Sequence, residues 1–271
     1  VHGYATGWGV TVAVVDTGVD RGHPDLVRRV AFAHNYVAHD MARFDGDEHG
    51  TAVAGVIASS ANNEIGIVGV APHARIRVYK ACSEAENGRA TCDSISLIRA
   101  LVDVVDHRPD ILNLSLAGPE DPLVRRLLSV AHQQGTVLVA AVDRRRSNVS
   151  FPAAMREVIS VGTPGIAGDR ADPDWTVVVP GSEVLTTTPG ATYGFKAGSS
   201  MATAYVSGVT ALMLERSPGL SSAQVREQLR ASAERTVNNV RLLNLCSTAT
   251  GEGSDQLCTG YASQVLPEAR P

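Results

Sequence analysis

Three side chains in this 271-residue chain are of the types that combine in nucleophilic catalysis. Asp16 ends a β-branched run and is followed by a Thr-Gly turn. His49 precedes residues 50–58, a run of small and apolar residues that predicts a closely packed helix. Ser200 follows a glycine and a serine and opens an apolar stretch that predicts a buried helix. Aspartate, histidine and serine, in any chain order, can form a catalytic triad.

The expected place of Ser200 at the start of a helix suits a nucleophile. Free N–H groups and the helix dipole favour negative charge there, so the N–H of Ser200 can donate to an oxyanion. His49 would remove the proton from Ser200, and Asp16 would orient the imidazole. Taken one at a time, these residues have common structural roles as a turn aspartate, a surface histidine and a helix-capping serine.

Short apolar runs alternate with helical patterns along the chain. Buried strands are predicted at 10–15, 76–80, 111–115, 137–141 and 158–161, and helices at 50–59, 94–107, 123–134, 200–215 and 221–233. This alternation predicts crossover connections, and therefore an α/β fold of three layers with helices on both faces of a mostly parallel sheet. In such sheets the reactive groups collect at the carboxyl ends of the strands.

Composition excludes several classes of protein. An apolar fraction of 44% with 25 glycines is typical of a globular enzyme with many tight turns. The net charge of −4, without a long basic block, argues against nucleic acid as a partner. No apolar run approaches the roughly 18 residues that span a bilayer. The chain begins at Val1 and not at methionine, so we expect a processed or trimmed product.

Four cysteines form two local pairs, Cys82 with Cys92 and Cys246 with Cys258. Their even number and polar surroundings predict two disulfides that each close a short surface loop; four free, buried thiols are the alternative. Disulfides would place the protein outside the cytoplasm, secreted or periplasmic. From about residue 245 the periodic pattern dissolves. We therefore expect one domain at 1–245 and a tail at 246–271 clipped to it by the second disulfide.

The three segments resemble the motifs of the subtilisin family of serine peptidases. Asp-Thr-Gly stands at 16–18, His-Gly-Thr at 49–51, and Gly-Ser-Ser-Met-Ala at 198–202, where the family has Gly-Thr-Ser-Met-Ala. The likeness runs through roughly residues 7 to 245. Ala204 stands where the family usually has proline, and we expect only a mild effect on the helix start.

The resemblance implies a serine endopeptidase of three-layer α/β fold that acts through an acyl-enzyme on Ser200 and needs no cofactor for its chemistry. Its partner would be a protein or peptide substrate. A cleaved pro-segment or an inhibitor is a further expected partner, and the chain is expected to be a monomer. A peptide ligase or macrocyclase is the alternative enzyme. The alternative outside the enzymes is a weakly active or inactive family member that binds peptides or partners through its cleft.

The resemblance also implies a substrate cleft. Residues 111–118 resemble the family strand that pairs with the substrate backbone and forms one wall of the S1 pocket. Residues 137–142 resemble the opposite wall, where Val142 replaces a usual glycine and predicts a narrower pocket. Residues 88–91 lie where the second substrate-pairing strand is expected. The implied substrate-binding residues are Ser115, Leu116, Ala117, Gly118, Ala140, Val142 and Ser150.

One departure from the family concerns the oxyanion hole, whose second donor is an asparagine side chain in the family. Asp143 stands at that position here. An ionised carboxylate only accepts hydrogen bonds, and losing such a donor costs roughly 3–4 kcal/mol in the transition state. Asp143 would have to be protonated, or Asn148 would have to reach the hole, or the enzyme would be slow.

A further resemblance implies a calcium site. Residues 62–67 resemble the family's calcium loop, and Asp25 matches its bidentate aspartate. Hard oxygen ligands of this mixture suit Ca²⁺. The family's N-terminal ligand lies upstream of what is Val1 here. The implied ligands are the side chains of Asp25 and Asn63 and the carbonyl groups of Ala61, Ile65 and Ile67.

An acidic cluster of Asp45, Asp47 and Glu48 precedes His49. In the family this neighbourhood borders the S2 pocket, so the cluster predicts a preference for basic residues on the substrate. The alternative is a solvated acidic loop.

Overall fold

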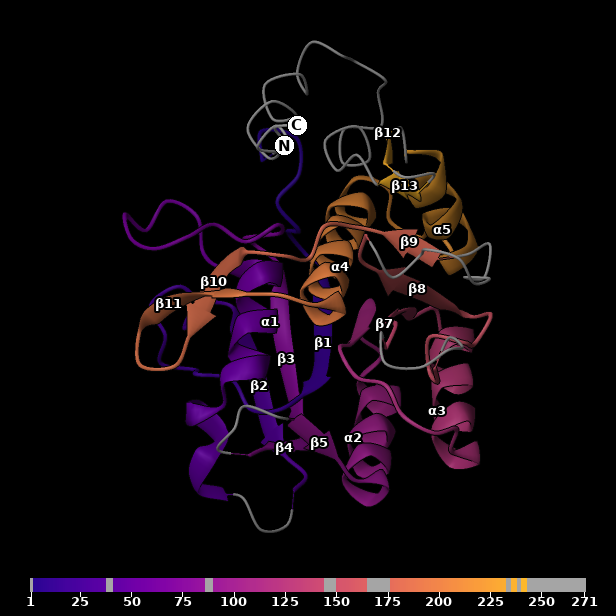
Figure 1. Ribbon diagram of the computed structural model, residues 1–271, viewed down its shortest axis with the longest axis horizontal. Helices are drawn as coiled ribbons and strands as arrows, with labels where there is room; N and C mark the ends of the chain where they lie inside the picture. Colours follow the sequence, from indigo (N-terminus) through magenta and orange to yellow (C-terminus); the bar gives the residue numbers. More distant parts are fainter. Residues whose placement is uncertain are drawn as a thin grey trace, which may run out of the picture.

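A computed structural model of the chain describes residues 2–37, 41–85, 90–143, 150–164, 176–232, 235–237 and 240–242. Within these ranges, nine strands form one sheet in the order β12-β13-β9-β8-β7-β6-β1-β3-β2 (Figure 1). Every neighbouring pair is parallel except β12 with β13. The strands are β1 (Thr11–Asp16), β2 (Val30–Asn35), β3 (Arg75–Lys80), β6 (Ile111–Leu114), β7 (Val137–Ala141), β8 (Val158–Gly162), β9 (Thr176–Val178), β12 (Arg235–Val237) and β13 (Val240–Leu242).

Helices cover both faces of this sheet, because successive side chains of each strand point to opposite faces. Val12 and Val14 of β1 pack in one apolar cluster with α1 (Glu48–Ala58), α4 (Ser199–Arg216) and α5 (Ser222–Ala231). Ala13 and Val15 pack in a second cluster with α2 (Ser94–His107) and α3 (Pro122–Gln133). These two clusters confirm the predicted three-layer α/β fold.

The predicted strands and helices all appear at the expected places, with ends that differ by a few residues. The sequence did not indicate β2, β9, β12 or β13, nor the short elements beside the sheet, apart from a substrate-pairing strand expected at 88–91, which overlaps one hairpin strand at 90–92. These short elements are the 3-10 helix η1 (Met41–Gly46) and two antiparallel hairpins, β4 (Cys82–Glu84) with β5 (Ala90–Cys92) and β10 (Val184–Thr188) with β11 (Thr192–Lys196).

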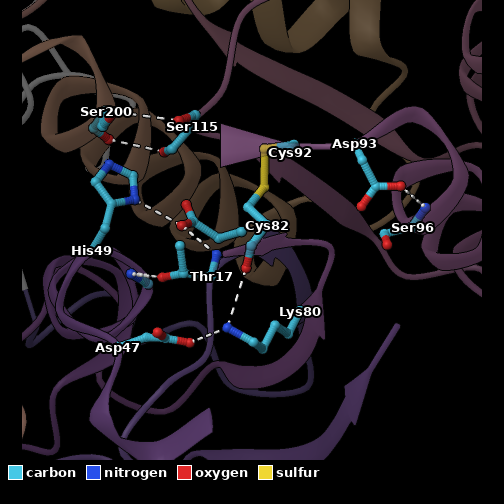
Figure 2. The surroundings of a disulfide bond; sticks show 12 residues. Thr17, Asp47, His49, Lys80, Cys82, Cys92, Asp93, Ser96, Ser115 and Ser200 are labelled. Atoms are coloured by element: carbon cyan, nitrogen blue, oxygen red, sulfur yellow. Dashed lines mark hydrogen bonds and ion pairs between the residues drawn. A yellow bond between two sulfur atoms is a disulfide. The ribbon is translucent and has the colours of Figure 1, made fainter. Parts of the chain in front are cut away.

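One of the two predicted disulfides lies within the described residues. Cys82 and Cys92 face each other across the β4–β5 hairpin and are bonded (Figure 2). The predicted Cys246–Cys258 bridge and the predicted tail at 246–271 lie outside the described residues, and the division of the chain at 245 stays a prediction.

The small residues of α1 let this helix pack directly on a hairpin. Residues 50–58 of the helix are all buried. The hydroxyl groups of Thr186 and Thr187 in β10 donate to the carbonyl groups of Ala52 and Thr51, at 2.7 and 2.8 Å. A Cβ atom added to Gly55 would come within 2.2 Å of the Thr187 hydroxyl. The α1 backbone, and with it the position of His49, is therefore fixed by close contact.

A buried ion pair joins the start of α1 to the sheet. Lys80, the last residue of β3, is 0% exposed, and Asp47, just before α1, is 2% exposed. The Lys80 ammonium group donates to the Asp47 carboxylate and, at 3.2 Å, to the carbonyl group of Cys82. The same carboxylate accepts the N–H of Gly18 at 2.7 Å, from the turn after β1. Three segments therefore meet at one desolvated carboxylate.

We predict that replacing Lys80 by methionine destabilises the fold by about 3–5 kcal/mol, because it leaves a carboxylate buried without its counter-charge. Equilibrium urea unfolding, in a Ser200→Ala background that prevents self-digestion, measures the loss.

The matched control is Arg21→Met, which removes the Arg21–Asp45 pair. Both side chains of that pair are about half exposed, so the expected loss is under about 1 kcal/mol. Equal losses in the two variants would contradict the role given to Lys80.

Candidate active site

Three elements bring the candidate catalytic side chains to one edge of the sheet. Asp16 is the last residue of β1, a central strand, and lies at its carboxyl end. His49 is in the first turn of α1, and Ser200 is in the first turn of α4. The helices α1 and α4 pack against each other, and Figure 2 shows the imidazole of His49 facing Ser200.

A short hydrogen bond joins the histidine to the aspartate. The Nδ1 atom of His49 lies 2.7 Å from Oδ1 of Asp16, and the same oxygen accepts the N–H of Thr17 at 2.7 Å. Asp16 is 3% exposed, whereas the side chain of His49 is 25% exposed. With Nδ1–H donated to the carboxylate, Nε2 is the nitrogen left to accept a proton.

The electrostatics of the pair favour a protonated imidazole. The negative charge of Asp16 raises the pKa of His49, burial opposes this, and the hydrogen bond to Asp16 adds to it. Among the described residues, Oδ2 of Asp16 is buried without a hydrogen-bond partner. A buried carboxylate this close to the imidazole stabilises its protonated form.

Two hydrogen bonds hold Ser200 against the segment after β6. The Ser200 hydroxyl donates to the carbonyl group of Ser115 at 3.3 Å, and the Ser115 hydroxyl donates to the carbonyl group of Ser200 at 3.1 Å (Figure 2). The Ser200 hydroxyl therefore donates to Ser115, and not to His49, in the described part of the structure. A hydrogen bond between a nucleophile and its general base commonly tightens only when substrate is bound.

The start of α4 offers backbone donors to an anion. Its N-cap is Gly198, at φ +130°, a backbone conformation that favours glycine. Since glycine has no side chain to cap the helix, the first-turn N–H groups are not capped by that residue. The N–H of Ser200 belongs to this turn, which is the geometry that an oxyanion hole needs.

The two predicted walls of the substrate pocket come together in the structure. Strand β6, which leads into Ser115, lies beside β7, with Leu114 opposite Ala140. Gly118 forms an antiparallel bridge with Phe151, through its N–H to the Phe151 carbonyl group at 2.9 Å. Val142 and Ser150 are buried, whereas Leu116, Ala117 and Gly118 are partly or fully exposed. Of the second substrate-pairing strand expected at 88–91, residues 90 and 91 lie in β5, and residues 88 and 89 lie outside the described residues.

The residues predicted for the oxyanion hole are only partly described. Asp143 lies two residues beyond the end of β7 and is partly exposed. Asn148 lies outside the described residues. The identity of the side-chain donor therefore stays a prediction.

The acidic cluster before His49 is paired within the chain, which argues against the predicted preference for basic substrates. Each acid has its own cation, in the pairs Asp45–Arg21, Asp47–Lys80 and Glu48–Lys196. Asp47 is also buried, so it presents no charge to a ligand. Sequence order alone could not show these pairs, because the cations come from distant segments.

Two of the residues predicted to bind calcium, Asn63 and Ile67, contact Asp25, each through an N–H donor. This carboxylate is fully buried and accepts hydrogen bonds from the Asn63 amide at 2.6 Å, the Ile67 N–H at 3.1 Å and the Tyr193 hydroxyl at 3.0 Å. The sequence did not single out Tyr193, whose pKa is raised to about 12 by burial and by Asp25.

The loop at 62–67, where the resemblance predicts calcium ligands, has an unusual backbone. Every second residue, Asn62, Glu64 and Gly66, has a positive φ of 58°, 62° and 61°. Such values are costly for asparagine and glutamate and persist where the surroundings impose them, as in ligand-binding loops. Across the described ranges, no three His, Cys, Asp or Glu side chains gather as a metal cluster. A cation here would therefore rely on one carboxylate, one amide and carbonyl oxygens, which is a set that suits Ca²⁺ and not zinc.

A serine at a helix N-terminus, with an imidazole that faces it and a buried carboxylate on Nδ1, is the arrangement of a serine hydrolase. The model of the subtilase family matches residues 7–257. Subtilisin from Bacillus pumilus is 35% identical over 244 residues, which cover 86% of each chain. Subtilisin E from Bacillus subtilis (strain 168) is 35% identical, and the match covers 86% of this chain and 62% of that protein. The chain belongs to the subtilase family and is a subtilisin-like serine peptidase.

Solved structures agree with this assignment. Fervidolysin from Fervidobacterium pennivorans, described as a keratinolytic enzyme related to subtilisin, is similar with a TM-score of 0.78 and 28% identity. The match covers 92% of this chain and 43% of that one. Sphericase is similar with a TM-score of 0.72 and 26% identity, over 84% of each chain. In the described part of this chain, no helix is long and apolar enough to cross a membrane.

We predict that Asp16→Asn lowers kcat/KM by about 10⁴-fold, because the amide no longer holds the imidazole in its productive tautomer. The pKa of His49 should also fall, since the charge of Asp16 is the largest effect that raises it. Peptide hydrolysis and an NMR titration of His49 measure the two effects.

Asp45→Asn is the matched control, because Asp45 lies in the same acidic stretch but pairs with Arg21. An Asp16→Asn variant as active as this control would contradict the assignment.

Proposed function

We propose that the chain cleaves peptide bonds within protein substrates, with Ser200 as nucleophile, His49 as general base and Asp16 as the orienting carboxylate. The observation that carries the proposal is the 2.7 Å contact between Asp16 and the Nδ1 atom of His49, on an imidazole that faces Ser200. It is supported by the relatives, two of which are named as a serine proteinase and a serine protease.

In this proposal His49 takes the proton of Ser200 through Nε2 as the hydroxyl oxygen attacks the substrate carbonyl carbon. The N–H of Ser200 donates to the oxyanion. His49 then gives the proton to the leaving amine, and water, activated by the same imidazole, hydrolyses the acyl-enzyme. The substrate backbone lies along the segment 115–118, and the first pocket is lined by Ala140, Val142 and Ser150.

The second donor to the oxyanion differs from that of the family, because Asp143 stands where the family has asparagine. An ionised Asp143 cannot donate a hydrogen bond. Either Asp143 is protonated during the reaction, which favours activity at lower pH, or Asn148 supplies the donor, or the backbone acts alone.

Labelling with a fluorophosphonate probe across pH tests both the function and the donor. The probe should modify the folded protein but not its Ser200→Ala variant.

We predict that Asp143→Asn raises kcat by up to about 100- to 1000-fold, because it restores a neutral donor.

The pH dependence separates the three sources of the donor. Labelling that rises as pH falls indicates a protonated Asp143, and a flat profile indicates Asn148 or the backbone. A folded protein that is not labelled at any pH would contradict the hydrolase function. Such a protein would point to a module that binds peptides through the same cleft.

A calcium ion at Asp25 is proposed as a structural part of the enzyme. The ligands would be the side chains of Asp25 and Asn63 and the carbonyl groups of Ala61, Ile65 and Ile67. It is supported by the full burial of Asp25 and by the positive φ angles of the loop. The ion would neutralise a buried carboxylate and hold the loop, and it would take no part in the chemistry.

We predict that EDTA lowers the Tm of the Ser200→Ala protein and that added Ca²⁺ restores it, because an ion that binds only the folded state stabilises it by mass action. Asp25→Asn should abolish the response to Ca²⁺. A Tm that is the same in EDTA and in millimolar Ca²⁺ would contradict the site.

We also propose that the protein works outside the cytoplasm. The Cys82–Cys92 disulfide supports this location, since disulfides persist in oxidising compartments. One relative is named the major intracellular serine protease of Bacillus subtilis (strain 168), so family membership alone does not fix the compartment. We further propose that the protein is a monomer and that a cleaved pro-segment or an inhibitor is among its partners.

A further inference from the structure

The helix turn that bears His49 is capped by a side chain from elsewhere in the chain. Asp47 is the N-cap residue of α1, but its carboxylate is engaged in the buried ion pair and makes no side-chain cap hydrogen bond. Glu84 caps the turn instead. One oxygen of its carboxylate accepts the N–H of Glu48 at 2.5 Å and the N–H of His49 at 3.3 Å. Negative charge at a helix N-terminus is favourable, because it interacts with free N–H groups and with the helix dipole.

Glu84 reaches this position from a hairpin that is fastened at its base. It is the last residue of β4, which pairs with β5. The Cys82–Cys92 disulfide closes the hairpin two residues earlier (Figure 2). The buried ammonium group of Lys80 donates to the carbonyl group of Cys82 at 3.2 Å. The carboxylate of Glu84 is therefore held at the helix start by covalent and polar anchors.

Charged groups from several elements surround the imidazole. Asp16 on β1 and Glu84 on β4 are negative and raise the pKa of His49, whereas Lys196 on β11 lowers it. Lys196 is itself paired with Glu48, the residue before His49. Burial raises the pKa of Glu84, and the two N–H groups that it accepts oppose that rise. After Asp16, Glu84 is the second negative group that acts on the imidazole.

We propose that Glu84 is a positioning residue for the peptidase reaction, which fixes the His49-bearing turn of α1 and places a negative charge beside the imidazole. The inference rests on the proposed role of His49 as general base. Glu84 does not touch the substrate or the reacting atoms in this proposal, and it acts through His49.

Two variants separate the charge of Glu84 from its hydrogen bonds. Glu84→Gln keeps a carbonyl oxygen that can accept both N–H groups but removes the charge. Because the base must be neutral to act, a lower pKa of His49 moves the acid limb of kcat/KM to lower pH. We expect a shift of up to about one pH unit, with the plateau largely kept. Glu84→Ala also loses the acceptor, so its plateau should fall by about 10- to 100-fold through misplacement of the imidazole.

The control is Glu227→Gln, which removes the same charge from an exposed position on α5 and should leave the profile unchanged. An acid limb of Glu84→Gln that coincides with the wild type would overturn the electrostatic part of the proposal. A Glu84→Ala plateau equal to that of the wild type would overturn the positioning part. If the alanine variant does not fold, the glutamine variant decides through its pH profile.

An NMR titration of the His49 imidazole tests the inference without turnover. If the protein proves inactive toward peptides and toward the fluorophosphonate probe, the proposed function fails. The titration still compares wild type with Glu84→Gln. A lower pKa of His49 in the variant supports the placement of the charge, and an unchanged pKa overturns it.

Discussion

The buried contact between Lys80 and Asp47 holds together the parts of the molecule on which the active site depends. It joins the carboxyl end of β3, the start of α1 and, through the N–H of Gly18, the turn after β1. Neither charge can be removed alone without leaving the other in a low-dielectric interior. The Asp16 and His49 backbones are therefore tied to one another by a contact that takes no part in the reaction.

The sequence was sufficient to predict five central strands of the sheet, the principal helices and the three catalytic candidates. Buried parallel strands are continuous apolar runs, and a helix with one buried face has a clear period, so both are local signals. Asp16, His49 and Ser200 were found because each lies at a strand end or helix start within a distinctive motif. The β10–β11 hairpin was missed because it lacks such a run and gains its contacts from α1.

The partners of charged side chains could not be predicted, because they depend on segments far apart in the sequence. The acids at 45, 47 and 48 suggested an open negative patch, yet each meets a cation of the same chain. Glu84 and Tyr193 gave no signal of their own. Their roles become visible only when the hairpin and β11 are placed beside α1 and Asp25. Local patterns therefore identify the reacting groups, and tertiary contacts determine their electrostatic setting.

The tight contact between α1 and β10 has a consequence for how this enzyme can diversify. Because Gly55 packs against Thr187, the helix is held in place, and the imidazole of His49 at its start is held with it. Larger side chains on its buried face would displace the helix, and with it His49, from Ser200. If the substrate binds as proposed, variation in substrate choice would fall on the segment 116–118, which is partly or fully exposed and lies outside this contact. Under the proposed function, the segment that selects a peptide is thus separate from the helix that carries the general base.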